Sequence, residues 1–203
     1  MNLRFPVVVS AAVFAFAAAP VWAQSPQDLM SPPSDLSQAG HGGQIYSLDT
    51  LFGALKIAPD ETSARAIEER IWMAWIASGS DTCNLLMSRV KDASDDKDYD
   101  LAIRLLDAVI AIKPDYVEAW NRRATVYYLK QDYAHSLADI AEVLAREPRH
   151  FGALSGLGMI LQEIGDDKDA LDAYRKALVI DPHLENVPDV VKTLTDKVEG
   201  RDI

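Results

Sequence analysis

Two acidic clusters are the first residues of this sequence whose types and spacing could do chemistry. DDKDYD at 95–100 and GDDKDA at 165–170 place carboxylates at short intervals, as the start of a calcium-binding loop does. In the first cluster, Leu101 holds the position that needs glycine, and the final glutamate ligand is absent. Each cluster precedes an apolar helical run, where carboxylates cap the helix and interact favourably with its dipole. We therefore interpret both clusters as helix caps.

The four histidines offer no recognisable site either. None of them pairs at the i, i+4 spacing of a helical metal site, and the sequence contains neither HExxH nor GxSxG: they are His41, His135, His150 and His183. We interpret His150 and His183 as solvated turn residues. With no nucleophile and base in a recognisable pattern, the sequence predicts a protein that is not an enzyme and needs no metal or cofactor.

Composition narrows the choice of partner. The 203 residues carry a formal net charge of −11, which disfavours nucleic acids and anionic lipid surfaces. Cys83 is the only cysteine, so no internal disulfide can form. We interpret it as a small buried apolar residue, with a reactive or intermolecular thiol as the alternative. Protein or peptide ligands remain the expected partners.

The beginning of the chain has the pattern of a secretory signal peptide. Arg4 precedes a short apolar run, Pro20 interrupts it, and Val21 and Ala23 stand at the positions that signal peptidase inspects. We therefore expect cleavage after Ala23, a periplasmic location and no stable membrane insertion of the mature protein; an uncleaved anchor is the alternative. The segment 24–46, rich in proline and glycine, is expected to form a flexible linker.

An internal repeat with a period of about 34 residues organises the rest of the chain. Pro114, Pro148 and Pro182 are evenly spaced at this period, and each closes an apolar helical run. Small residues recur where paired helices must approach closely, as Ala124 and Gly158 do. A proline cannot donate a hydrogen bond inside a helix, so it separates one hairpin from the next. The pattern predicts stacked helical hairpins.

The segments AWNRRATVYYLKQDY…P and ALSGLGMILQEIGDDKDALDAYRKALVIDP resemble the tetratricopeptide repeat family. The resemblance implies an all-α, right-handed α-α superhelix, that is, a solenoid of this family. The expected parts are a degenerate N-terminal hairpin (47–82), three repeats within 83–182 (83–116, which is degenerate, 117–150 and 151–184) and a C-terminal capping helix (185–203).

Two adjacent arginines in the second repeat are expected to have different roles. Arg123 and Asp139 are replaced by Leu157 and Ala173 one repeat later, so we expect a structural pair. Arg122 lies about 100 degrees further round the helix, on the face that lines the concave groove in this family. We expect Arg122 to be exposed there and to orient an acidic or carbonyl-rich ligand.

The same resemblance places the candidate partner-binding residues on the first helices of two repeats. They are Asn121, Arg122, Thr125 and Tyr128, with Glu118 beside them, and then Ser155, Gly156, Met159 and Gln162, with Gly152 beside them. Some family members clamp a terminal carboxylate with basic residues, but here Met87, Gly152 and Gly156 replace several of those residues. A merely solvated face is the alternative.

A second candidate surface is the apolar run IWMAWIA at 71–77. It covers every side of a helix, as a helix packed between neighbours does. The alternative is docking through Trp72 or Trp75, a residue type common at binding hot spots. The sequence thus predicts a periplasmic adaptor, scaffold or chaperone-like protein that binds a partner on its concave face. The alternative is a stable non-catalytic subunit of a cell-envelope enzyme or assembly complex.

Overall fold

The computed structural model describes residues 47–200, and this part of the chain is helical throughout, with no strand. The predicted signal peptide and linker lie outside the described residues. The helices are α2 (Leu48–Leu55), α3 (Glu61–Ile76), α4 (Asp81–Asp95), α5 (Tyr99–Ile112), α6 (Val117–Leu129), α7 (Tyr133–Arg146), α8 (Phe151–Glu163), α9 (Asp167–Ile180) and α10 (Val187–Val198). None of these helices is both long and apolar enough to cross a membrane.

The turn inside each repeat is built the same way three times. Asp98, Asp132 and Asp166 occupy the same position in successive repeats, and each side chain accepts a hydrogen bond from the backbone N–H of the third residue after it. The residue before each aspartate has a positive φ, although glycine occupies that position only in the last repeat. Asp98 and Asp166 belong to the two acidic clusters, so the interpretation of those clusters as helix caps is confirmed.

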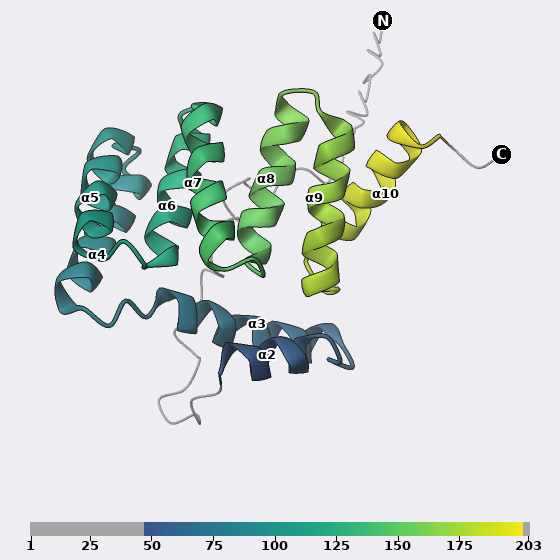
Figure 1. Cartoon of the computed structure of the whole chain (residues 1–203), viewed down its shortest axis with the longest axis horizontal. Coiled ribbons are helices and arrows are strands. Elements are labelled where there is room, and N and C mark those ends of the chain that lie inside the picture. Colours follow the sequence, from purple (N-terminus) through teal and green to yellow (C-terminus); the bar gives the residue numbers. More distant parts are fainter. Residues whose placement is uncertain (1–46, 201–203) are drawn as a thin grey trace, which may run out of the picture.

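The hairpins α4–α5, α6–α7 and α8–α9 stack side by side into an all-α superhelix, and α10 packs against α9 at its end (Figure 1). Close packing inside a hairpin requires small residues. A Cβ atom on Gly158 of α8 would lie 2.8 Å from the ring of Tyr174 on α9. Cys83 is completely buried, which confirms its interpretation as a core residue. Val187 and Leu194 bury one face of α10.

The hairpin of α2 and α3 does not continue this stack. It lies across one end of the vertical helices in Figure 1, along the turns that join successive repeats. Its apolar residues share a core with α6–α10, and Trp72 and Trp75 are both buried in it. The structure therefore favours the interpretation of 71–77 as a helix packed between neighbours, because the tryptophans are covered by the chain itself.

Candidate functional site

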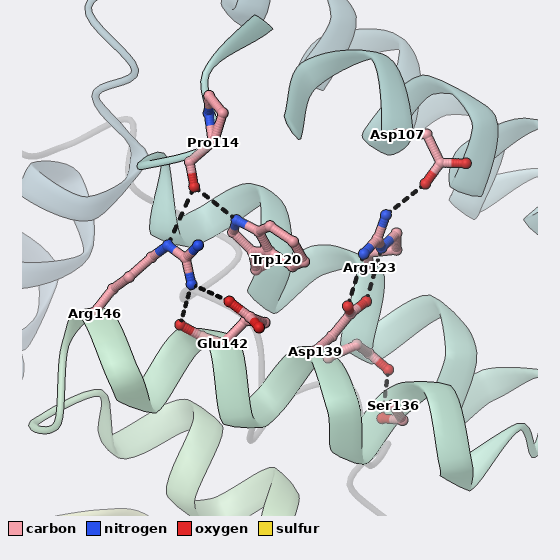
Figure 2. Close-up of polar contacts among 9 residues, drawn as sticks. Asp107, Pro114, Trp120, Arg123, Ser136, Asp139, Glu142 and Arg146 are labelled. Atoms are coloured by element: carbon pink, nitrogen blue, oxygen red, sulfur yellow. Dashed lines mark hydrogen bonds and ion pairs between the residues drawn. The ribbon is translucent and has the colours of Figure 1, made fainter. Parts of the chain in front are cut away.

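Arg123 is a structural residue on α6 that forms hydrogen bonds to both α5 and α7 (Figure 2). Its Nε and Nη2 donate to the two carboxylate oxygens of Asp139 on α7, both at 2.8 Å, and its Nη1 donates to Asp107 on α5 at 2.6 Å. The hydrogen bond to Asp139 is the main cause that raises the pKa of Arg123 above its usual range. The predicted pair of Arg123 and Asp139 is confirmed, and Asp107 is a third member that the repeat spacing did not indicate.

The neighbouring contacts in Figure 2 join one repeat to the next. The carbonyl oxygen of Pro114, which ends the first repeat, accepts from Trp120 Nε1 at 3.0 Å and from Arg146 Nε at 3.1 Å. The Trp120 ring lies near the guanidinium groups of Arg123 and Arg146, each 4.9 Å from the ring centroid. The proline that ends this repeat therefore also supplies an acceptor that fixes the start of the next one.

Arg122 has an ion-pair partner on its own helix. Its Nε donates to Glu118 Oε1 at 2.6 Å, and Glu118 is completely buried. Burial would raise the pKa of Glu118, but Arg122 and His150 outweigh it and hold that pKa below its usual value. Arg122 is less exposed than expected, with 28% of its side chain accessible, and its guanidinium neutralises a buried carboxylate on its own helix. Its expected contact with a ligand stays a prediction. The i, i+4 spacing of Glu118 and Arg122 was a signal for this pair.

The other candidate residues lie on α6 and α8, and their polar atoms are largely used within the chain. Asn121 donates to Glu118 at 3.1 Å, and Thr125 donates to the backbone oxygen of Asn121 at 3.0 Å. Gln162 accepts from the hydroxyl of Tyr174 at 2.8 Å. Exposed fractions are 0% for Asn121 and Ser155, 5% for Thr125, and 8% for Tyr128 and Met159.

A strip of small residues follows one side of α8. Gly152, Ser155 and Gly156 are all buried, and the hydroxyl of Ser155 is the largest group among their side chains. Within 47–200, this hydroxyl has no hydrogen-bond partner. Such a strip lets another backbone approach closely, and the hydroxyl can donate to a carbonyl or accept from an amide.

His150 is a structural residue, and its interpretation as a solvated turn residue was wrong. It is completely buried, and its Nδ1 accepts from the backbone N–H of Ala153 at 3.1 Å, which caps α8. Its ring stacks on Trp75 of α3 with centroids 4.0 Å apart and planes 10° apart. Trp72 packs edge-on against the neighbouring Phe151, with ring centroids 5.5 Å apart. Sequence spacing gave no signal for this contact, because it joins segments that are distant in the chain.

Comparison with known proteins defines the class of protein. The tetratricopeptide repeat model matches residues 88–139 and 130–185. A TPR repeat-containing protein from Rhizobium etli is 43% identical over 153 residues, which are 75% of each chain. The chain therefore belongs to the tetratricopeptide repeat family. A small glutamine-rich tetratricopeptide repeat-containing protein of Saccharomyces cerevisiae is 29% identical over 85 residues, 42% of this chain and 25% of that relative.

Solved structures show the same fold at low sequence identity. The first tetratricopeptide domain of Spaghetti (RPAP3), bound to an HSP90 peptide, matches 59% of this chain and 95% of its own, with a TM-score of 0.56 and 17% identity. The Sgt2 domain from Aspergillus fumigatus matches 59% of this chain and 81% of its own, with a TM-score of 0.55 and 23% identity. These likenesses establish the superhelical fold.

Proposed function

We propose that this protein is an exported adaptor that binds a protein or peptide partner on the concave side of its superhelix, without catalysis. The observation that carries this proposal is the strip of Gly152, Ser155 and Gly156 on α8, whose Ser155 hydroxyl has no hydrogen-bond partner among the described residues. The signal-like segment 1–23 supports a periplasmic location. The Spaghetti domain, a structural neighbour, was solved with a peptide bound.

The contacts of Arg122 narrow the kind of partner. Its Nε is bonded to Glu118, so part of its charge is already neutralised within the chain and it would attract a terminal carboxylate less strongly. What α8 offers instead is a close approach for a backbone, the hydroxyl of Ser155 and the adaptable side chain of Met159. We therefore propose recognition of an uncharged or apolar segment through backbone contacts, in place of an acidic terminus.

A docking subunit that uses Trp72 and Trp75 is the weaker candidate. Both indole rings pack on His150 and Phe151 within the chain, so a partner would first have to displace α3.

Replacing Gly156 by leucine tests the proposal. The new side chain fills the strip, so we expect capture of periplasmic partners by the full chain to fall by about tenfold or more, with little dependence on salt because the obstruction is steric. Gly53→Leu on α2 is the matched control, since a Cβ atom there meets nothing within 4 Å. Thermal melting checks that both variants fold. Undiminished capture by a folded Gly156→Leu protein would contradict the concave-face assignment.

A further inference from the structure

Helix α3 touches three successive inter-repeat turns, one after another along its length. Its C-terminal end meets the first turn: the hydroxyl of Tyr116 donates to the carbonyl of Ile76 at 2.7 Å, and Lys113 Nζ donates to the carbonyl of Ser78 at 2.5 Å. Figure 1 shows α3 running across the ends of the repeat helices. This first contact pairs neutral or cationic donors with backbone oxygens, so raising the pH over the neutral range leaves it intact.

The last turns of α3, just before its C-terminal end, meet the second turn through apolar and aromatic surface. Trp75 stacks on His150, and Trp72 packs on His150 and Phe151 at centroid distances of 5.3 and 5.5 Å. Burial of two indole rings makes this the main hydrophobic attachment of the helix to the repeats.

The N-terminal half of α3 meets the third turn through acidic groups on both sides. Glu68 of α3 interacts with Asp181, which is completely buried at the end of α9. Asp181 Oδ1 accepts from the backbone N–H of His183 at 3.0 Å, and Oδ2 has no donor among the other described groups. Two carboxylates can meet here only if one of them carries a proton, and a protonated Glu68 supplies the donor that Oδ2 lacks.

We propose that α3 is a strut that holds the curvature of the superhelix, and that loss of the proton shared by Glu68 and Asp181 releases its contact with the last repeat. Hairpins of a solenoid contact only their neighbours, so a rigid helix across three turns restrains the rotation between repeats. Release at the third turn leaves the first two contacts in place. The consequence for partner binding on the concave side rests on the proposed function; the release itself does not.

The contact between Glu68 and Asp181 is expected to weaken as the pH rises. Burial, followed by the charge of Asp181, raises the pKa of Glu68 from 4.5 to about 8. The contact is therefore strongest below about pH 4.5, weakens as the pH rises, and is lost above about pH 8. Burial also raises the pKa of Asp181. The charged or titratable groups that face the pair are Arg65 and Glu69 on α3 and His183 and Glu185 on the third turn, with Arg65 and Glu185 joined at 3.3 Å.

Distance measurements between spin labels test the release on the full chain without any partner. One pair of cysteines at Ala66 and Val179, both exposed, reports the third contact, and a pair at Met73 and Ile112 reports the first. Both pairs are made in a Cys83→Ala background. Between about pH 5.5 and about pH 9.5, we expect a new population at longer distance for the Ala66–Val179 pair only.

Two glutamine variants separate the shared proton from general charge effects. In Glu68→Gln the amide donates to Asp181 at every pH, so the long-distance population should disappear at high pH. Glu69→Gln, at the next position of α3, should behave like the wild type. The proposal is overturned if the wild-type distances do not change with pH or if both label pairs change together. It is also overturned if the Ala66–Val179 pair in Glu68→Gln still shows the long-distance population at high pH. If the protein captures no partner but the label distances change as expected, the result contradicts the proposed function and not the pH-dependent release of α3.

Discussion

Truncation of Arg122 to alanine is expected to lower the free energy of unfolding by roughly 3–5 kcal/mol, because it leaves a buried carboxylate without its counter-charge. Glu118 has no exposed surface, and Arg122 Nε lies 2.6 Å from its Oε1. Asn121 also donates to Glu118, but a neutral amide does not neutralise the charge. Urea denaturation at neutral pH measures the loss.

The double variant Arg122→Ala with Glu118→Gln is the control, and it should recover most of the lost stability because no buried charge remains. The pH dependence gives an independent check. In the wild type, the lowered pKa of Glu118 contributes stability that is present above about pH 4.5 and is lost as the pH falls. In Arg122→Ala we expect the opposite sign, since protonation then removes the penalty. A variant as stable as the wild type would show that the ion pair does not hold the fold.

The second large effect is expected at the attachment of α3. Replacing Trp75 by alanine removes a buried indole ring that packs on His150, Phe151 and Phe52, and should cost roughly 3–5 kcal/mol. Met73, on the same helix, is 40% exposed, so Met73→Ala should cost far less. Both are measured by urea denaturation. Equal losses for the two variants would mean that α3 is not docked through its tryptophans.

The repeats were predictable because their signal is periodic. The regular spacing of prolines, small residues and aspartate caps indicates where each hairpin begins and ends, and the replacement of Arg123 and Asp139 by Leu157 and Ala173 indicated a paired interaction. Fold class and the Arg123 pair therefore followed from local rules of packing and capping.

The features that escaped prediction depend on where distant segments meet. The apolar run at 71–77 indicated a buried helix, but not that its tryptophans would lie on the turn at His150. The same contact explains why His150 is buried and not solvated. For Arg122, the face of the helix was inferred from the family, whereas the nearby Glu118 decides what the charge does. In both cases, contacts with particular neighbouring residues decide the surroundings of the side chain, and its position in the repeat does not.

Photo-crosslinking from the concave side tests the central claim most directly. Tyr128 lies on α6 among the candidate residues and is 8% exposed, while the adjacent Tyr127 stacks on His135 of α7. An aromatic photo-crosslinking residue replaces each tyrosine in turn in the full chain, and the cells are irradiated. The account predicts a discrete partner adduct from position 128 that is absent from position 127 and is lost in Gly156→Leu. Adducts of equal strength from both positions, or from position 127 alone, would contradict it.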